Sequence, residues 1–328
     1  MTEISFNFDN TYTKLNDYFF SRLKPIPVKN PTIVIFNKVL SKKLGINLYD
    51  CNQSELAKYF SGNILPVKSE PISQAYAGHQ FGHFTMLGDG RAILIGEHIS
   101  PYDKRYDIQF KGSGITPYSR TGDGRAALKP MIREYLISEA MFSLNIPTSR
   151  SLCVVATGEN INREKLLPGA ILTRVASSHI RIGTFQYAYL KNDHSLLKEL
   201  FNYTLRRHYD HINKNNNVVL EFLYEVMIKQ IDLVINWMRV GFVHGVMNTD
   251  NIALSGETID YGPCAFMNTY NPKTVFSSID YMGRYSYLNQ SIIMQWNLAR
   301  FAETLIPLID GNKKKSVNLA SEIIEEFD

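Results

Sequence analysis

The sequence predicts an α+β fold in which strands dominate the first part of the chain and helices the second. Residues 71–126 are rich in glycine and carry short apolar runs typical of strands, whereas residues 221–308 include long segments with apolar residues at helical spacing. At 328 residues the chain can form one two-lobed domain or two ordinary domains. We expect an N-terminal region and a strand-rich small lobe over residues 1–190, and a helical large lobe over residues 191–328.

Apolar runs in the first lobe predict four strands and one helix. The strands are expected at residues 92–97, 107–111, 151–157 and 169–175. Apolar residues at helical spacing predict a helix from Met131 to Asn145, which Pro130 can start and Pro147 ends. Residues 1–70 mix short helical signals with loops.

Two long helices are expected in the second lobe. The segment from Glu221 to Val240 has a broad apolar face, and Gly241 is a natural stop. Another helix is expected at residues 289–308. Residues 191–219 are polar and include Asn215–Asn217, which indicates a loop or a connection between the lobes.

Composition indicates a globular protein without a nucleic-acid or membrane partner. The apolar fraction is 45% and the charged fraction 20%, both ordinary for such proteins. The formal net charge of +4 is too weak to indicate binding to nucleic acid or to an anionic membrane. The one basic run, Lys313–Lys315, is expected to be a solvated turn. No window approaches 18 consecutive apolar residues, so no membrane span is expected.

The three cysteines indicate a reducing compartment. Cys51, Cys153 and Cys264 are widely spaced and form neither a C-x-x-C pair nor an even disulfide framework. The first residues lack the basic segment and apolar run of a signal peptide. We therefore expect a cytoplasmic protein, and we expect it to be a monomer.

The segment His244–Asn251 has the skeleton of a kinase catalytic loop with one part replaced. Protein kinases carry H-R-D-x-x-x-x-N followed by D-F-G. With His244 at the first position, the last falls on Asn251, and Asp260–Gly262 occupies the place of D-F-G. The position of the catalytic aspartate falls on Val246, which cannot accept a proton. A kinase that has lost its activity and an enzyme that transfers another group both fit this pattern.

Three side chains of this region suit a metal and a base. Asn251 and Asp260 supply oxygen ligands of the kind that Mg²⁺ takes together with phosphate oxygens. Asp250 is the only carboxylate of the loop and is the best candidate for the general base. The alternative is an Asx-rich turn. We favour the site because His244, Asn251 and the Asp-Tyr-Gly triplet occur in the kinase order.

A lysine and a glutamate of the first lobe also follow the kinase order. Lys111 ends an expected strand, as the lysine of V-A-I-K does, and Glu134 lies on the following helix. In kinases this lysine contacts phosphates while paired with the glutamate. The alternative is two separate surface residues. Together with the loop, this order predicts a protein-kinase-like two-lobed fold with a strand-rich small lobe and a helical large lobe.

Two glycine loops and two arginines are further candidates for phosphate contacts. Gly88 and Gly90 let backbone N–H groups approach a phosphate, and Arg91 adds a charge, although a plain tight turn is the alternative. The same pentapeptide recurs at Gly122–Ala126, by chance or as a second polar loop near a nucleotide. Arg174 and Arg181 suit bidentate phosphate contacts, with surface salt bridges as the alternative. Asp123 and Gly124 are the candidate residues of the second loop.

A histidine pair is a weaker metal candidate. His79 and His83 have the spacing of H-E-x-x-H, but Gln80 stands in place of the glutamate and Gly82 disfavours a helix. We expect a loop or core histidine instead.

Taken together, these motifs resemble the selenoprotein O family, the YdiU-type pseudokinases. The resemblance covers roughly residues 70–310. It is carried by the stretches 74–82, 87–92, 111–120, 122–126, 132–134 and 244–262.

The resemblance implies a protein-kinase-like fold that binds ATP in a flipped orientation and transfers AMP to Ser, Thr or Tyr hydroxyls of proteins. It implies that Asp250 is the proton acceptor, that Asn251 and Asp260 bind Mg²⁺ or Mn²⁺, and that Lys111 pairs with Glu134. The residues implied to contact the nucleotide are Gly88, Gly90, Arg91, Lys111, Asp123, Gly124, Arg174, Arg181 and Asp260.

The chain departs from the family in length, since members usually exceed about 400 residues, and we expect the later part of the large lobe to be missing. A catalytically inactive ATP-binding pseudokinase or scaffold is therefore the alternative function. A genuine kinase is disfavoured because Val246 cannot serve as the base.

Overall fold

The computed structural model describes residues 4–46, 51–212 and 217–327. By compactness the chain divides into two units, which are described separately. Unit 1 comprises Met1–Ala75 and Leu87–His179, and unit 2 comprises Tyr76–Met86 and Ile180–Asp328. These units are defined by internal packing, and the lobe boundary between residues 190 and 191 stays a prediction.

Unit 1 is built on an eight-stranded antiparallel sheet. Its strands run in the order β1-β3-β6-β7-β10-β9-β2, and β8 pairs with β10. The bounds are β1 Phe20–Arg22, β2 Thr32–Phe36, β3 Ile72–Gln74, β6 Ala92–Ile99, β7 Arg105–Lys111, β8 Ala126–Ala127, β9 Arg150–Asn162 and β10 Leu166–Ala176. The four strands expected from apolar runs are confirmed as β6, β7, β9 and β10, of which the last two form a longer hairpin than predicted.

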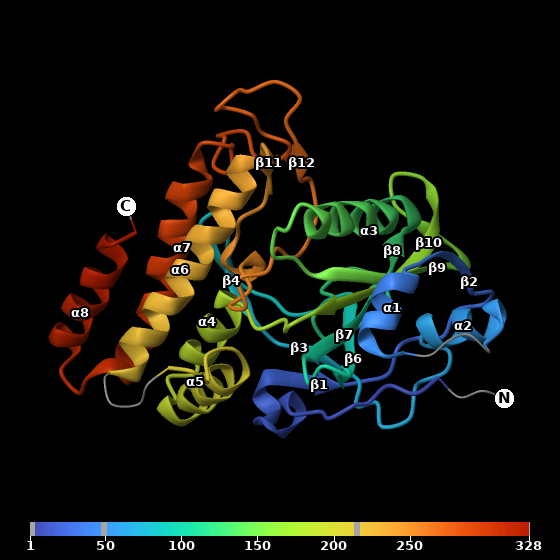
Figure 1. Ribbon diagram of the computed structural model, residues 1–328, viewed down its shortest axis with the longest axis horizontal. Coiled ribbons are helices and arrows are strands. Elements are labelled where there is room, and N and C mark those ends of the chain that lie inside the picture. Colours follow the sequence, from blue (N-terminus) through green and yellow to red (C-terminus); the bar gives the residue numbers. More distant parts are fainter. Residues whose placement is uncertain (1–3, 47–50, 213–216, 328) are drawn as a thin grey trace. The chain divides into compact units, whose positions relative to one another are not determined.

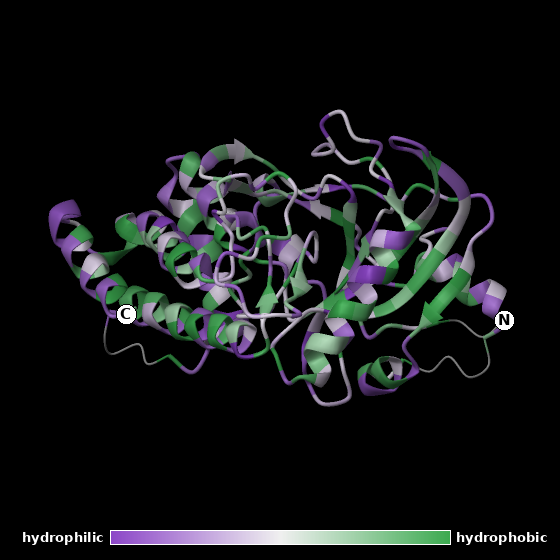
Figure 2. Cartoon of the chain, turned by 90° about the horizontal axis from the view of Figure 1, so that it is seen from above, coloured by the Kyte–Doolittle hydropathy of each residue, from purple (hydrophilic) through white to green (hydrophobic). Residues whose placement is uncertain are grey.

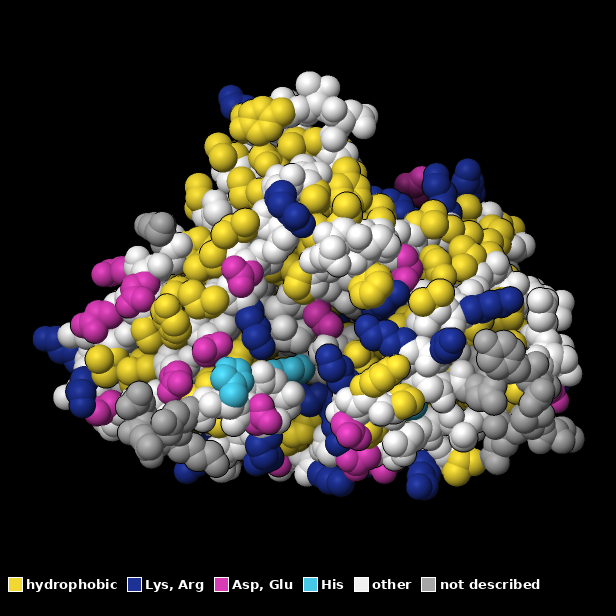
Figure 3. Space-filling view, viewed as in Figure 1, with side chains coloured by type: hydrophobic (Ala, Val, Ile, Leu, Met, Phe, Trp, Pro, Cys, Tyr) yellow, Lys and Arg dark blue, Asp and Glu magenta, His cyan; other side chains and the backbone are white. Residues whose placement is uncertain are grey.

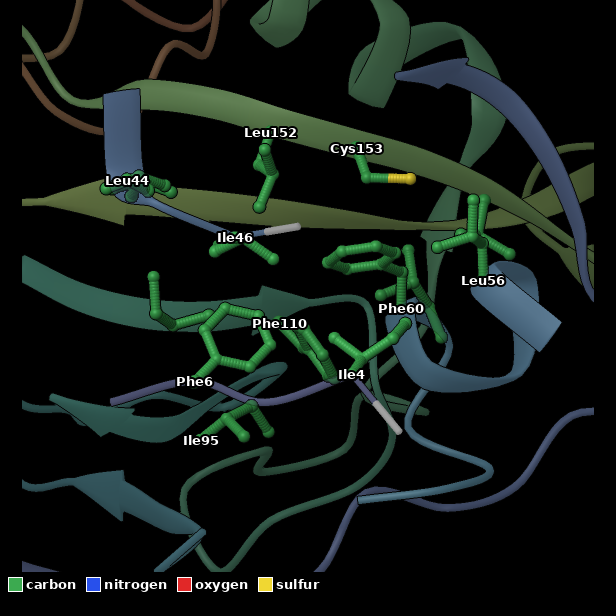
Figure 4. Close-up of a cluster of buried hydrophobic side chains, with 14 of the residues drawn as sticks. Ile4, Phe6, Leu44, Ile46, Leu56, Phe60, Ile95, Phe110, Leu152 and Cys153 are labelled. Atoms are coloured by element: carbon green, nitrogen blue, oxygen red, sulfur yellow. The ribbon is translucent and has the colours of Figure 1, made fainter. Parts of the chain in front are cut away.

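The described residues of unit 1 also form three helices and two short 3₁₀ turns. They are η1 Tyr12–Lys14, η2 Asp17–Phe19, α1 Lys38–Leu44, α2 Gln53–Phe60 and α3 Leu128–Ser143. The helix expected at residues 131–145 is confirmed as α3. It ends where Asn145 adopts a left-handed backbone with φ of 58°, before Pro147. Figure 4 shows the core, in which side chains of the central strands and of the short helices near the N-terminus interdigitate.

Unit 2 is mainly helical. Its helices are α4 Ile182–Leu190, α5 His194–His208, α6 Val218–Arg239, α7 Asn289–Ile309 and α8 Lys313–Glu325. Its short elements are β4 Ala77–Gln80, β5 His83–Met86, β11 Phe242–Val243, the 3₁₀ turn η3 Thr249–Asn251 and β12 Ala265–Phe266. The two long helices expected from periodicity are confirmed as α6 and α7, and they lie side by side with α8 (Figure 1). The fold class is thus α+β.

The expected loop at residues 191–219 is wrong for most of its length, because α5 occupies residues 194–208. Asp193 caps this helix by accepting a hydrogen bond from the backbone N–H of Ser195. The helix buries Leu196, Leu200 and Phe201 and exposes Lys198 and Arg206, so tertiary packing outweighs its polar composition. Of the three asparagines, residues 215 and 216 lie outside the described residues, and residue 217 caps α6.

The basic run is exposed, as expected, but it is helical and not a turn. Lys313–Lys315 forms the first turn of α8, and the side chain of Asn312 accepts a hydrogen bond from the backbone N–H of Lys315. Hydrophobic residues follow the strands and the inner helix faces, whereas α8 carries much hydrophilic surface (Figure 2). Among the described helices, none has the length and apolar character needed to cross a membrane.

Candidate functional site

In unit 1 the structure brings Lys111, Glu134 and Arg174 together. Lys111 ends β7, and its Nζ lies 2.7 Å from Oε2 of Glu134 on α3. Arg174 on β10 donates from Nε (3.0 Å) and Nη2 (2.6 Å) to the other carboxylate oxygen, Oε1. All three side chains are buried. Two cations therefore share one carboxylate, and each cation is held in a fixed position by charge-assisted hydrogen bonds.

This network extends to the first glycine loop through two residues that the sequence did not single out. Gln109 accepts a hydrogen bond from Nη1 of Arg174 at 3.2 Å, and its amide nitrogen donates to Oδ2 of Asp89 at 3.0 Å. Asp89 lies between Gly88 and Gly90, so the loop is tied to the arginine. The signal in the sequence that could have identified this link is Gln109 itself, a polar residue between the apolar Ile108 and Phe110.

The glycines of both loops are required by close packing within unit 1. A Cβ on Gly88, whose φ is 147°, would lie 2.3 Å from the Tyr118 ring, and one on Gly90 would lie 2.7 Å from the Tyr118 carbonyl oxygen. A Cβ on Gly124 would lie 2.1 Å from the backbone of Gly114. Glycine is thus needed at these positions whether or not a nucleotide is bound.

The charged residues of these loops differ in their surroundings. Arg91 is exposed. Asp123 forms an ion pair with Arg163, whose Nη1 lies 2.8 Å from Oδ2 of the carboxylate. The hydrogen bonds from Arg163 lower the pKa of Asp123 below its ordinary value. Any contact of Arg91 or Asp123 with a nucleotide stays a prediction.

In unit 2 the catalytic-loop candidate is fixed at its start by a buried histidine. His244 follows β11, and its Nε2 donates to the carbonyl of Ile259 at 2.9 Å, beside Asp260. Burial lowers the pKa of His244, and the hydrogen bond to Ile259 opposes this shift. His244 therefore holds the loop against the segment that carries Asp260.

Asp250 lies in η3 and is 6% exposed. Two glycines crowd it: a Cβ on Gly78 would lie 2.4 Å from Oδ1 of Asp250, and a Cβ on Gly183 would lie 3.2 Å from its Cα. Among the described residues, Oδ1 has no hydrogen-bond partner. Burial raises the pKa of Asp250 to about 6. A buried carboxylate oxygen without a donor is suited to accept a proton from a substrate.

Asn251 and Asp260 have oxygen atoms suited to Mg²⁺ or Mn²⁺. The amide nitrogen of Asn251 donates to the carbonyl of Val246 at 2.9 Å, which leaves the amide oxygen as its remaining side-chain acceptor. Asp260 adopts a left-handed backbone with φ of 59°, and its side chain is 22% exposed. The described residues contain no group of three or more His, Cys, Asp or Glu side chains able to hold a metal. An amide, a carboxylate and phosphate oxygens need no such group.

Arg181 lies beside Asp260. Its Nη2 is 3.2 Å from Oδ2 of Asp260, and its guanidinium lies 4.4 Å from the centre of the Tyr76 ring. The residue is buried at the start of α4, where its backbone N–H donates to the hydroxyl of Thr184. Arg181 and Asp260 are thus brought together within unit 2.

A ring of hydrogen bonds that the sequence did not predict joins β4 to the loop. The backbone N–H of His79 donates to the hydroxyl of Thr249 (2.7 Å), which donates to the amide oxygen of Gln186 (2.7 Å). The amide nitrogen of Gln186 donates to Nδ1 of His79 at 2.9 Å. His79 is thus engaged in packing, while His83 is exposed. The ring fixes Thr249, the residue directly before Asp250.

The family model described as "Protein adenylyltransferase SelO" matches residues 2–327. The chain belongs to the SelO family. A relative from Nitrosococcus oceani, named protein nucleotidyltransferase YdiU, is 59% identical over 99% of this chain and 66% of its own length. A relative of the same name from Pelagibacter ubique is 58% identical over 99% of this chain and 67% of its own length. The chain spans about two thirds of the length of these SelO-family relatives.

Two solved structures resemble the chain distantly. One is the kinase domain of a rhoptry antigen from Toxoplasma gondii, 11% identical over 76% of this chain and 79% of its own, with a TM-score of 0.34. The other, also from Toxoplasma gondii, is described as a virulence factor with a protein-kinase fold and no enzymatic activity. It is 7% identical over 78% of this chain and 87% of its own, with a TM-score of 0.32. TM-scores this low support no conclusion about this SelO-family chain.

Proposed function

We propose that the chain is a protein adenylyltransferase, which transfers AMP from ATP to Ser, Thr or Tyr hydroxyls of proteins and releases pyrophosphate. The observation that carries the proposal is the environment of Asp250. Its Oδ1 is buried without a hydrogen-bond donor, directly before Asn251, while Val246 occupies the position of the usual kinase base. The names of its SelO-family relatives also support nucleotidyl transfer.

In the proposed reaction Asp250 accepts the proton of the acceptor hydroxyl. The hydroxyl oxygen forms a bond to the α-phosphorus of ATP, and the bond from that phosphorus to the bridging oxygen of the β-phosphate breaks. Pyrophosphate leaves with the electron pair of the broken bond. Asn251 and Asp260 would hold Mg²⁺ or Mn²⁺, which offsets phosphate charge when bound.

Charged residues of each unit have separate proposed roles. In unit 1, Lys111 and Arg174 are proposed to bind phosphate oxygens, with Glu134 fixing both cations. In unit 2, Arg181 is proposed to bind phosphate beside Asp260. The proposed backbone and loop contacts to the nucleotide come from Gly88, Gly90, Arg91, Asp123 and Gly124.

Labelled ATP tests the proposal directly. The protein is incubated with a generic protein acceptor, Mg²⁺ or Mn²⁺, and ATP labelled at the α- or γ-phosphorus. We expect protein-bound label from α-labelled ATP only. Asp250→Asn should lower this transfer about 10²- to 10⁴-fold, because it removes the proton acceptor. Asp232→Asn, at an exposed position of α6, is the matched control and should retain activity.

Two outcomes would contradict the proposal. Protein label from γ-labelled ATP alone would indicate a kinase. Metal-dependent ATP binding without any label on protein would favour the inactive ATP-binding protein.

A further inference from the structure

An arginine–tryptophan cluster, formed by Arg284, Trp296 and Arg300, lies in unit 2 outside the residues proposed for phosphate transfer. The guanidinium carbon of Arg284 is 4.7 Å from the centre of the Trp296 ring, and that of Arg300 is 5.3 Å from it. The indole also meets the His79 ring edge to face, with ring centres 5.2 Å apart. The cluster therefore lies against β4.

The cluster holds more positive charge than its neighbours neutralise. Arg300 pairs with Glu303 at 2.7 Å, but no described carboxylate lies within salt-bridge distance of Arg284. Within the described part of the chain, the Nε atoms of both arginines are buried and have no hydrogen-bond acceptor. The pKa of His79 is lowered, mainly by burial and then by the charges of Arg300 and Arg284. The side chains of Arg284 and Arg300 are only partly buried, so an acidic group from outside can approach their guanidinium groups.

The cluster is anchored to the candidate catalytic loop. The carboxylate of Asp280 accepts hydrogen bonds from the backbone N–H groups of Arg284 (2.9 Å) and Tyr285 (2.8 Å). The hydroxyl of Tyr285 then donates to Oδ1 of Asn248 at 2.6 Å. Asn248 lies two residues before Asp250, so this hydrogen bond ties the turn that carries Arg284 to the segment of the proposed base.

Large apolar side chains are exposed on the adjoining segments. Tyr281 is 89% exposed and Met282 93%, on the turn that directly precedes Arg284. Phe84 and Met86 are exposed on β5, and the Phe84 ring contacts His79. Figure 3 shows hydrophobic side chains gathered on the projecting loop after β12. Exposed Tyr and Met beside Arg are typical of protein interfaces.

We propose that the arginine–tryptophan cluster binds an acidic side chain of the protein acceptor, close in sequence to the hydroxyl that receives AMP. The proposal rests on the adenylyltransferase function and adds a substrate class to it. A carboxylate satisfies the guanidinium donors, and Tyr281 and Met282 provide apolar contacts beside it. The cluster thus selects acceptor hydroxyls flanked by Asp or Glu.

Tryptophan fluorescence measures this binding without catalysis. The chain has two tryptophans, and Trp237 is buried, so a change on binding reports Trp296 and should vanish in Trp296→Phe. Three peptides carry one Ser flanked by Glu, by Gln or by Lys. We expect the Glu peptide to bind about tenfold more tightly than the Gln peptide, with the Lys peptide weakest.

Variants separate a charge effect from a folding defect. Arg284→Gln should remove the preference for the Glu peptide, and Arg284→Lys should restore part of it. Arg206→Gln, at an exposed position of α5, is the matched control and should keep the full preference. Equal binding of the Glu and Gln peptides by the unchanged protein, or binding of neither, overturns the proposal.

Transfer assays with the same peptides separate this proposal from the proposed function. We expect Arg284→Gln to raise KM for the Glu peptide about tenfold and to leave KM for ATP within about twofold. AMP transfer that is indifferent to flanking charge would overturn the docking surface and retain the adenylyltransferase. Charge-dependent binding without any AMP transfer would retain the surface and overturn the adenylyltransferase.

Discussion

At the scale of single residues, Asp250 shows how a proposed catalytic group opposes stability. Its carboxylate is buried against Gly78 and Gly183, and its Oδ1 has no donor among the described residues. Burial disfavours the charged form and raises the pKa to about 6, above the ordinary value of 3.8. Each pKa unit corresponds to about 1.4 kcal/mol, so the ionised carboxylate costs about 3 kcal/mol of folding free energy at neutral pH.

Asp250→Asn should therefore stabilise the protein at pH 8. Between pH 4 and pH 6 the folded state binds more protons at this carboxyl than the unfolded state, so its contribution to stability falls as pH rises through that window. Asparagine has no charged form. The free energy of unfolding of Asp250→Asn should therefore exceed that of the unchanged protein by about 3 kcal/mol above this window, and the difference should disappear below pH 4. Denaturant unfolding without metal or nucleotide measures the difference.

The matched variant for this measurement is Asp232→Asn, whose carboxylate is exposed. It should show no pH-dependent gain. A gain for Asp250→Asn that is the same at pH 4 and pH 8 would argue against a buried charged carboxylate.

At the scale of elements, β4 and η3 act as one support for the proposed base. Gln186 on α4 accepts from Thr249 and donates to His79, so one side chain links the two elements. Sequence periodicity could not predict this link, because β4 spans only Ala77–Gln80 and its partners are far away in the chain. The long helices α6 and α7 were predictable because their apolar faces repeat over many turns, whereas the polar residues of α5 concealed its buried face.

Gln186→Leu should slow catalysis without weakening nucleotide binding. The change removes two hydrogen bonds that fix Thr249 and His79, each worth about 1 kcal/mol. We expect kcat to fall about tenfold and KM for ATP to stay within about twofold, as steady-state kinetics with α-labelled ATP would measure.

Gln186→Glu gives a graded comparison, because it keeps an acceptor for Thr249 and loses the donor to His79. Its kcat should lie between those of the unchanged protein and Gln186→Leu. If Gln186→Leu instead lowers the amount of folded protein and leaves kcat per folded molecule unchanged, the link is structural only.

At the scale of the whole molecule, the order of motifs along the chain predicted more than composition did. Composition and charge indicated only a globular protein, while the order from Lys111 and Glu134 to Asn251 and Asp260 indicated a family to which the chain indeed belongs. The contacts that hold these residues were not predictable. The hydrogen bonds from Arg174 to Glu134 depend on the register of β10 in the sheet. The contacts of Asp250 with Gly78 and Gly183 depend on packing between segments that are distant in the sequence.

Metal and ATP together should stabilise the whole chain. A ligand that binds only the folded protein at about one hundred times its Kd adds about 2.7 kcal/mol, which for a chain of this size corresponds to a rise in Tm of several degrees. We expect this rise with ATP and Mg²⁺ or Mn²⁺, and its loss on adding EDTA. Asp260→Asn should remove most of the metal-dependent rise, as thermal unfolding would measure, whereas an unchanged rise in this variant would exclude Asp260 as a metal ligand.

The glycines beside Asp250 also limit how this catalytic centre can be altered. A methyl group at residue 78 would fall 2.4 Å from Oδ1, and one at residue 183 would fall 2.1 Å from the carbonyl oxygen of Ala77. Any side chain larger than hydrogen at residue 78 or 183 would therefore force the backbone or Asp250 to move, and Asp250→Glu would add a methylene to a side chain that already lies against Gly78. Directed evolution toward new acceptors should therefore leave these three positions untouched and accumulate its changes on the exposed segments instead.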